Sequence, residues 1–271
     1  MSDLTANGVR FNVIELGEGE PYVVFLHGLV MDSLSSWYYT LANPVAREGK
    51  ALLYDLRGHG LTEQPATGYR LEDALADLRA ILDAVGAPAP LYLVGNSYGG
   101  LIALTMAMEE PERVAGMVLC EAHFPSEDWG RNTAATLDFA GVGLQDEMNR
   151  NLVAEHGKRH HKRRVGRAEA MLRDTSLIAD MRACAPLPKA ELAKIQTPAL
   201  ALYGSESDII ERGHELAGAL PNCELRVLEG GGHTILMHNT RWVREQILQW
   251  LHAQWSLTPK MGTGTISSSA G

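Results

Sequence analysis

Apolar residues recur along this chain with two periods, and stretches of the two kinds follow one another up to about residue 255. Short apolar runs rich in β-branched residues, such as YVVFL and ALALY, are typical of buried strands. The strands predicted in this way cover residues 9–16, 22–28, 51–55, 91–96, 113–121, 199–205 and 223–228.

Amphipathic helices are predicted between these strands. From Leu71 to Val85 the apolar residues recur at steps of three and four, and Gly86 and Pro88 end the pattern. Further helices are predicted at residues 41–48, 101–108, 209–220 and 240–255. Strands that alternate with helices imply right-handed crossovers, so we expect a mainly parallel sheet covered by helices on both faces.

The alternation of strands and helices stops after Glu121, and helix-like pieces without a convincing strand follow it. We interpret this segment as a helical cap inserted into the core. The predicted organisation is a core formed by residues 1–121 and 190–255, a cap at 122–189, and a disordered Gly/Ser-rich tail at 256–271.

Composition and charge narrow the class of protein. The 271 residues are 45% hydrophobic, enough for a sizeable core, and the net charge of -9 argues against nucleic-acid binding. The N-terminus lacks a signal-peptide pattern and no apolar run approaches about 18 residues, so we expect a cytoplasmic protein without a membrane span. The three cysteines form no C-x-x-C pair, and we expect free thiols and no metal site.

The stretch LYLVGNSYGG carries the strongest chemical signal. It is typical of a buried strand, a sharp turn and the start of a helix, with Ser97 in the turn. Gly95 and Gly99 flank the serine in the pattern G-x-S-x-G, where small residues permit a strained turn that exposes the hydroxyl. Taken alone, the pattern also fits a simple loop. Its place between a strand and a helix predicts a nucleophile elbow with Ser97 as the nucleophile.

A serine hydroxyl needs a base to become a nucleophile, and the base needs an acid that orients it. His233 is the predicted base, because it follows the last strand in the glycine-rich loop GGGH near the end of the chain. The chain order serine, acid, histidine places the base there. We therefore expect Ser97 and His233 to lie within reach of each other.

Four motifs together resemble the α/β-hydrolase family, and the resemblance extends from Val9 to Trp255. The motifs follow the family's order and spacing, which makes them more specific together than singly. The resemblance implies an α/β-hydrolase fold, with a mostly parallel central sheet flanked by helices and an inserted helical cap. The motifs are HGL at 27–29, DLRGHG at 55–60, GNSYGG at 95–100 and GGGHT at 230–234.

The resemblance also implies an oxyanion hole beside the nucleophile. The backbone N–H groups of Leu29 and Tyr98 occupy the positions of the family's donors, which stabilise developing negative charge. We interpret His27 and His59 as residues that shape this loop and the pocket floor, and not as metal ligands. The residues expected to line the substrate pocket are His27, Gly28, His123, Phe124 and Trp129.

Two carboxylates compete for the role of the acid. Most family members carry the acid shortly after the penultimate strand, where Ser207 occupies the usual position and Asp208 follows it. Some lactone hydrolases and polyketide-chain thioesterases take it from the end of the strand after the nucleophile helix, where Glu121 lies. A carboxylate at the end of a buried strand needs a partner, and His233 is a suitable one. We prefer Glu121 as the acid and keep Asp208 as the alternative.

The predicted activity is that of a cofactor-independent serine hydrolase that cleaves a carboxylic ester or lactone by acyl transfer. Ser97 attacks the carbonyl, His233 carries the proton, and Glu121 or Asp208 orients the imidazole. A serine nucleophile disfavours haloalkane dehalogenase and epoxide hydrolase chemistry, because an alkyl-ester intermediate needs a carboxylate. No metal-binding or dinucleotide-binding motif suggests a cofactor.

The sequence leaves the substrate and the partners open. Apolar cap residues such as Phe124 and Trp129 favour a hydrophobic acyl or aromatic group, or simply pack the cap onto the sheet. The alternative functions are a thioesterase for carrier-protein or coenzyme A thioesters, a hydrolase of carbon–carbon bonds in diketone-like metabolites, and a small-molecule receptor. A basic segment of the cap is either a solvated helix face or a docking surface for an acidic carrier protein or an anionic substrate. It contains Lys158, Arg159, Lys162, Arg163, Arg164 and Arg167.

Overall fold

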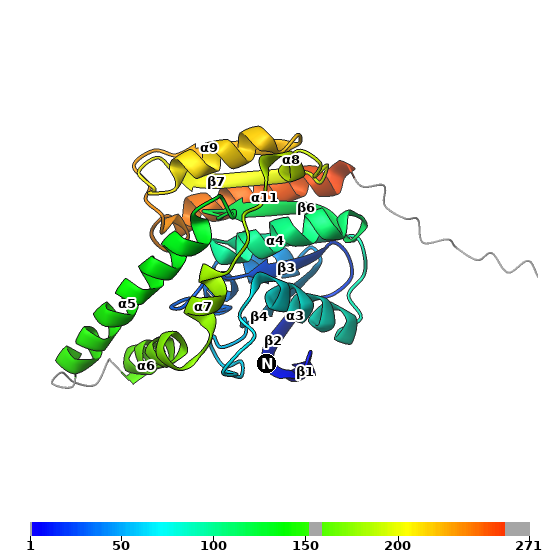
Figure 1. Ribbon diagram of the computed structural model, residues 1–271. Helices are drawn as coiled ribbons and strands as arrows, with labels where there is room; N and C mark the ends of the chain where they lie inside the picture. Colours follow the sequence, from blue (N-terminus) through cyan, green and yellow to red (C-terminus); the bar gives the residue numbers. More distant parts are fainter. Residues whose placement is uncertain (1, 152–158, 258–271) are drawn as a thin grey trace, which may run out of the picture.

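One eight-stranded sheet organises the computed structural model, which describes residues 2–151 and 159–257 (Figure 1). The strand order is β1-β2-β4-β3-β5-β6-β7-β8; β2 runs antiparallel to β1 and β4, and all the other pairs are parallel. The expected mostly parallel sheet is therefore confirmed. The strands are β1 (Ser2–Ala6), β2 (Val9–Gly17), β3 (Tyr22–Leu26), β4 (Lys50–Tyr54), β5 (Leu91–Asn96), β6 (Val114–Cys120), β7 (Ala199–Gly204) and β8 (Cys223–Leu228).

Helices cover both faces of this sheet. They are α1 (Ser35–Trp37), η1 (Tyr38–Ala42), α2 (Asn43–Ala46), α3 (Leu71–Ala84), α4 (Tyr98–Glu109), η2 (Pro111–Arg113), α8 (Lys189–Leu192), α9 (Ile210–Ala219), α10 (Ile235–His238) and α11 (Thr240–Leu257). Side chains of β3 alternate between two apolar layers: Val24 and Leu26 pack with α3 and α4, whereas Val23 and Phe25 pack with α1, α2 and α11. Burial on both faces explains why β3 is apolar throughout.

Three helices lie between β6 and α8 in the described part of the chain, where the sequence predicts the cap: α5 (Trp129–Asn151), α6 (Arg159–Asp174) and α7 (Leu177–Arg182). Figure 1 shows α5 extending away from the sheet, with α6 and α7 beside it. Met171 and Leu177 pack into the same apolar layer as α4, so the helices are anchored to the core. Residues 152–158 and, from residue 258, the predicted tail lie outside the described residues. Within the described ranges, every helix is too short or too polar to cross a membrane.

The first strand is one that the hydrophobic pattern does not predict. β1 pairs with β2 across a tight turn at Asn7 and Gly8, whose φ angles are 45° and 73°. Asn-Gly is the favoured sequence for such a two-residue hairpin turn, because both positions require positive φ. The Asn-Gly pair therefore indicates a hairpin turn at this point of the sequence. The segment SDLTA before it is polar and does not alternate clearly enough to indicate a strand. The helix expected at 41–48 also differs, because helical structure begins at Ser35 and ends at Ala46.

Backbone segments approach one another closely around the turn between β5 and α4. A Cβ atom at Gly99 would lie 2.2 Å from the carbonyl oxygen of Leu26, and one at Gly95 would lie 2.3 Å from the carbonyl oxygen of Gly99. Both glycines are therefore required by packing, since no larger residue leaves room for the end of β3 against the first turn of α4.

Replacing Gly99 by alanine is expected to destabilise the fold by roughly 1–3 kcal/mol, because the added methyl group overlaps the backbone of β3. The matched control is Gly218→Ala in α9, where a Cβ meets no atom within 4 Å. That change should stabilise the protein by roughly 0.5–1 kcal/mol through helix propensity. Urea unfolding measures both free energies, and equal effects of the two substitutions would contradict the packing argument.

Candidate active site

Ser97 lies on a strained turn between β5 and α4. Its φ and ψ angles are 52° and -114°, a conformation that non-glycine residues rarely adopt. The backbone N–H of Ser97 donates to the carbonyl oxygen of Cys120 over 2.8 Å, which ties the turn to the end of β6. Within the described residues the hydroxyl has no hydrogen-bond partner, and the side chain is partly exposed. The hydroxyl is therefore free to meet a ligand.

Glu121 and His233 form a hydrogen bond although 112 positions separate them along the chain. His233 Nδ1 lies 3.1 Å from Glu121 Oε2, and the carboxylate is fully buried directly after β6. Glu121 also accepts hydrogen bonds from the Gly204 N–H and the Ser207 hydroxyl, each over 2.6 Å. These three donors satisfy a carboxylate whose burial is otherwise costly.

The contact with Glu121 fixes the tautomer of His233. An ionised carboxylate can only accept hydrogen bonds, so Nδ1 carries the proton and Nε2 keeps its lone pair. Burial alone lowers the pKa of His233, but the hydrogen bond and charge of Glu121, with a smaller contribution from Asp208, outweigh burial and raise the pKa above its usual value. The ring is thus arranged to accept a proton at Nε2.

Asp208 is the weaker partner of His233. Its Oδ1 atom lies 3.8 Å from His233 Nδ1, and its side chain is 82% exposed. Ser207, one residue earlier, is buried and donates its hydroxyl to Glu121. Sequence reasoning did not assign a role to Ser207, and the pattern of this loop holds no signal for one.

Two backbone donors face the region of Ser97 without a partner. In the described part of the chain, the N–H groups of Leu29 and Tyr98 donate to no acceptor. The HGL loop (residues 27–31) passes directly over the serine, because a Cβ at Gly28 would lie 3.4 Å from Ser97 Cβ. Asp32 holds this loop by accepting the Gly28 N–H over 2.8 Å. Two free donors beside a free hydroxyl can bind a negatively charged oxygen.

Two buried histidines support the HGL loop. His27 Nδ1 lies 2.7 Å from the carbonyl oxygen of Gly28, and its Nε2 accepts the Leu56 N–H over 2.9 Å. His59 Nε2 accepts the Val30 N–H over 2.8 Å. Val30 has a φ of 65°, which is unfavourable for a β-branched residue, so this hydrogen bond helps to hold a strained conformation. In both rings Nε2 is the nitrogen that accepts a backbone hydrogen bond.

The remaining pocket residues expected from the sequence come from the start of the cap. His123 lies beside His233, with ring centroids 5.5 Å apart, and its other neighbour is Trp129 at 6.1 Å. Burial, together with the charge of His233, lowers the pKa of His123 to about 4, so its ring is neutral at pH 7. Phe124 is buried in the apolar layer. Among the described residues no group of three His, Cys, Asp or Glu side chains could hold a metal ion.

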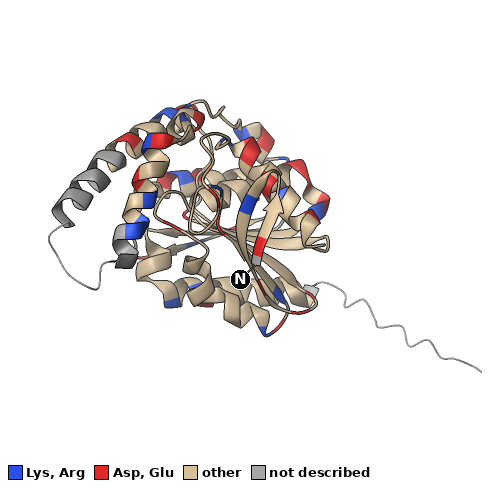
Figure 2. Ribbon diagram, turned by 90° about the horizontal axis from the view of Figure 1, so that it is seen from below, with Lys and Arg blue, Asp and Glu red and all other residues tan. Residues whose placement is uncertain are grey.

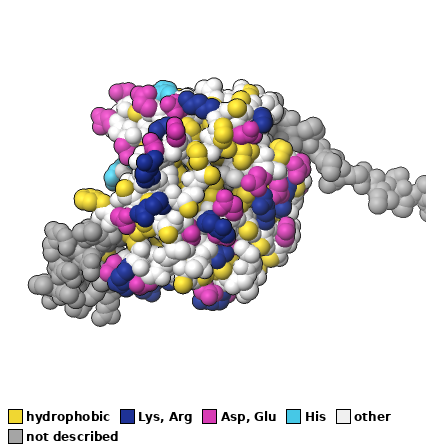
Figure 3. All heavy atoms as spheres, viewed as in Figure 1, with side chains coloured by type: hydrophobic (Ala, Val, Ile, Leu, Met, Phe, Trp, Pro, Cys, Tyr) yellow, Lys and Arg dark blue, Asp and Glu magenta, His cyan; other side chains and the backbone are white. Residues whose placement is uncertain are grey.

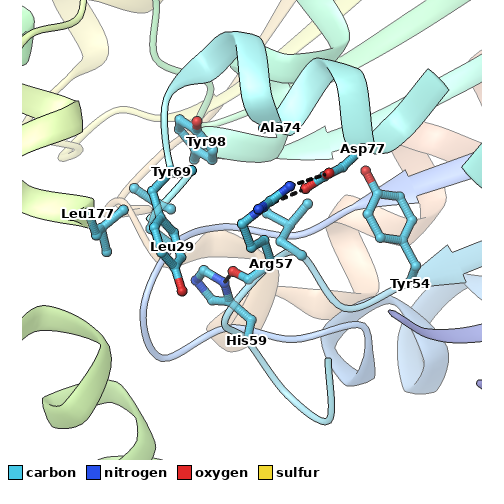
Figure 4. Close-up of a pocket in the computed structure, with 11 residues that line it drawn as sticks. Leu29, Tyr54, Arg57, His59, Tyr69, Ala74, Asp77, Tyr98 and Leu177 are labelled. Carbon is cyan, nitrogen blue, oxygen red and sulfur yellow. Dashed lines mark hydrogen bonds and ion pairs between the residues drawn. The ribbon is translucent and has the colours of Figure 1, made fainter. Parts of the chain in front are cut away.

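A small cavity lies behind the HGL loop (Figure 4). Leu29, His59 and Tyr98 line it beside the Arg57–Asp77 ion pair. Its volume of about 20 Å³ is enough for one water molecule but not for a substrate.

The pH dependence of stability should reveal the neutral His59. Burial, with the nearby His27, lowers the pKa of His59 to about 3, whereas unfolded histidine has a pKa of about 6.5. The unfolded state therefore binds a proton that the folded state rejects, and stability falls as the pH decreases below about 6.5. Between pH 7 and pH 5 this single group should remove about 2 kcal/mol.

His59→Gln keeps a hydrogen-bond acceptor but cannot titrate, so its free energy of unfolding should decrease less over the same pH interval. The control is His214→Gln, which removes an exposed histidine of α9 and should retain the wild-type pH dependence. Identical slopes for wild type and His59→Gln would show that His59 is not held neutral.

Two curated relatives match the chain in part. It is 32% identical over 123 residues to epoxide hydrolase 4 of Mus musculus, an alignment that covers 44% of this chain and 33% of that protein. It is 34% identical over 120 residues to 2-hydroxy-6-oxo-2,4-heptadienoate hydrolase of Pseudomonas putida, which covers 43% of this chain and 42% of the relative. The chain therefore matches less than half the length of each of these relatives.

Solved structures match over nearly the whole chain. Est816, described as an N-acyl homoserine lactone degrading enzyme, superposes with a TM-score of 0.70 and 25% sequence identity, covering 92% of this chain and 100% of that one. The model of the alpha/beta hydrolase family matches residues 23–246, which include the serine turn, the buried carboxylate and the late histidine. The chain belongs to the alpha/beta hydrolase family.

Proposed function

We propose that this protein is a cofactor-independent serine hydrolase that cleaves a carboxylic ester or lactone by acyl transfer. The observation that carries the proposal is the hydrogen bond from His233 Nδ1 to the buried Glu121, which leaves Nε2 available as a base. A free serine hydroxyl on a strained turn and two unpaired backbone donors support the same reaction.

In the acylation step, His233 Nε2 takes the proton of the Ser97 hydroxyl while the oxygen attacks the substrate carbonyl. Negative charge develops on the carbonyl oxygen, and the N–H groups of Leu29 and Tyr98 bind it. Each such donor contributes roughly 2.7–4 kcal/mol to lowering the barrier. The imidazolium of His233 then gives its proton to the departing alcohol oxygen, which leaves an acyl group on Ser97.

In the deacylation step, His233 removes a proton from water, and the water oxygen attacks the acyl carbonyl carbon while the same backbone donors bind the carbonyl oxygen. The bond between the acyl carbon and the Ser97 oxygen then breaks, and His233 returns its proton to that oxygen, which releases the acid and restores the free serine. Glu121 stays ionised throughout, because it holds the Nδ1 proton and stabilises the positive ring. We assign the acid to Glu121 and not to Asp208, since Glu121 is buried and lies at hydrogen-bond distance, whereas Asp208 is exposed and lies 3.8 Å away.

The relationship to an epoxide hydrolase does not extend to its reaction in this proposal. Opening an epoxide through a covalent intermediate needs a carboxylate that forms an alkyl ester, and this chain carries Ser97 at the turn. Hydrolysis of a carbon–carbon bond is the second candidate. The similarity to 2-hydroxy-6-oxo-2,4-heptadienoate hydrolase supports it, and it can use the same serine, base and oxyanion donors.

Turnover of p-nitrophenyl butyrate tests the proposal. Wild type should release many equivalents of p-nitrophenol, and Ser97→Ala should lower kcat by roughly 10⁴-fold or more, because the attacking oxygen is lost. The control is Ser256→Ala, which removes an exposed hydroxyl at the end of α11 and should leave kcat unchanged. Tight ligand binding with at most one turnover would identify a receptor instead, and unchanged turnover by Ser97→Ala would exclude the serine mechanism.

Substitution of the two carboxylates tests the choice of acid. Glu121→Gln should lower kcat/KM by roughly 10³- to 10⁴-fold, because the amide can turn a donor toward Nδ1 and no longer stabilises the charged ring. Since Glu121 raises the pKa of His233, the acid limb of the pH–rate profile should also move to lower pH in this variant. Asp208→Asn should change kcat/KM by less than about threefold, as expected for an exposed charge. If Asp208→Asn abolishes activity and Glu121→Gln does not, Asp208 is the acid that orients His233.

A further inference from the structure

A second pocket lies between the HGL loop and α6. Its volume is about 270 Å³, more than ten times that of the cavity behind the loop. Val30 and Met31 form one wall, directly after the proposed oxyanion donor Leu29. The opposite wall holds three arginines of the basic segment: Arg163, Arg164 and Arg167. We call this space the arginine pocket.

None of the three arginines has a carboxylate partner in the described part of the chain. Arg164 donates to the carbonyl oxygen of Met31, and Arg167 donates to the carbonyl oxygens of Gly58 and Thr62. Arg163 makes no hydrogen bond or ion pair with the described residues. Two of the guanidinium groups are thus held in place by backbone atoms, and neither has a carboxylate at ion-pair distance among the described residues.

Most other arginines of this acidic protein are paired. In the face seen in Figure 3, basic and acidic side chains lie side by side, whereas Figure 2 shows a run of basic residues along the described part of α6. Arginines with an Asp or Glu partner are Arg10, Arg57, Arg70, Arg79, Arg113, Arg131, Arg173, Arg182, Arg212, Arg226 and Arg241.

Two carboxylates line the arginine pocket, but their oxygens are already occupied. Asp55 accepts from the N–H groups of Leu34 and Leu61 and from Asn12. Asp32 accepts hydrogen bonds from the backbone N–H groups of Gly28 and Ser33. Because these carboxylates are engaged with the core, they leave the three arginines without a direct partner. The charges that line the pocket therefore sum to a positive value.

Arg167 is partly buried, whereas Arg163 and Arg164 are exposed, so the absence of an anion is unfavourable mainly for Arg167. Burial and the nearby Arg163 help to lower the pKa of Arg167, and Asp55 offsets this effect only in part. Like charges held together in partly desolvated surroundings repel each other more than in water. A bound anion would remove that repulsion and accept charge-assisted hydrogen bonds, which guanidinium groups form with carboxylate and phosphate oxygens.

We propose that the arginine pocket binds an anionic group, a carboxylate or a phosphate, at the far end of the acyl substrate. The proposal rests on the proposed function, because it places the reacting carbonyl at Leu29 and Tyr98 and the anion beyond Met31 on the same loop. A small anion fits better than a carrier protein, since Arg164 and Arg167 turn inward onto the HGL loop and the 58–62 segment. The substrate class is then an ester or lactone with a negatively charged tail.

Matched esters test this substrate class. The neutral ester is p-nitrophenyl valerate; its charged counterparts are mono-p-nitrophenyl glutarate, with the succinate and adipate homologues, and p-nitrophenyl 4-phosphonobutyrate. For at least one charged ester, the kcat/KM of wild type should exceed the kcat/KM for p-nitrophenyl valerate by about tenfold. A charge-assisted hydrogen bond to the anionic group contributes enough binding free energy for a difference of about this size. Comparing the carboxylates with the phosphonate identifies which anion the pocket prefers.

Arg163→Gln should lower the ratio of charged to neutral kcat/KM by about tenfold, and Arg163→Gln with Arg164→Gln should lower it further. Arg163 is exposed and makes no hydrogen bond or ion pair with the described residues, so its replacement should not disturb folding. The control is Arg47→Gln, which removes the same charge from an exposed arginine after α2; Arg47 precedes β4, whereas Asp55 of the pocket follows the other end of that strand. This control should keep the wild-type ratio.

Three results would overturn the proposal. They are a wild-type ratio near one, a ratio that Arg163→Gln leaves unchanged, and an equal fall in the Arg47→Gln control. If the ratio is unchanged but Arg163→Gln slows turnover of an acyl-carrier-protein thioester, the basic segment docks a protein instead. If no ester is cleaved at all, the proposed function fails by itself. Calorimetric binding of glutarate to wild type and Arg163→Gln then decides the anion site independently.

Discussion

The buried carboxylate of Glu121 is the group on which the arrangement of the site depends. It gathers a backbone N–H at the end of β7, the Ser207 hydroxyl and the His233 ring around one charge. An ionised carboxylate without such donors would cost several kcal/mol in this environment. The loops after β7 and β8 must therefore close on Glu121 for the fold to be stable. The same closure orients the imidazole, so stability and the geometry of the base have one cause.

Neutral histidines play the corresponding role on the other side of the serine. The rings of His27 and His59 lie 5.1 Å apart and join the loop after β3 to the loop after β4 through backbone hydrogen bonds. A neutral imidazole both donates and accepts, which allows one side chain to bridge two loops that have no ladder between them. One of these hydrogen bonds holds Val30, whose φ of 65° is strained, next to Leu29. The site is therefore pre-organised from both sides before a substrate enters.

The strand ends and helix α6 contribute different properties. Strand ends and the loops after them provide the hydroxyl, the imidazole, the carboxylate and the backbone donors, which serve the acyl transfer proposed above. Helix α6 brings arginines to the HGL loop from a segment about 70 positions after the serine. Because α6 is anchored through apolar residues such as Met171, its charged face can vary without disturbing the core. Such a division lets one reaction serve different substrates.

Much of the fold and the central residues of the site could be predicted from the sequence alone. The period of two in the buried strands and the glycines around Ser97 are local properties, set by backbone geometry and side-chain size. The hairpin at Asn7 was not predicted, because its first strand is polar, although the Asn-Gly pair in its turn is typical of a hairpin. These features depend only on neighbouring positions, which is why they can be read directly.

Tertiary structure alone decided which partners meet. Glu121 and Asp208 both fit the chain order, and only the path of the loop after β7 buries Ser207 and leaves Asp208 facing solvent. The basic segment likewise has the composition of an ordinary exposed helix until α6 is placed against the HGL loop. Such contacts join residues about 100 positions apart and depend on differences of about 1 Å in the distances between atoms. A periodic pattern along the chain indicates only which face of a helix or strand is buried.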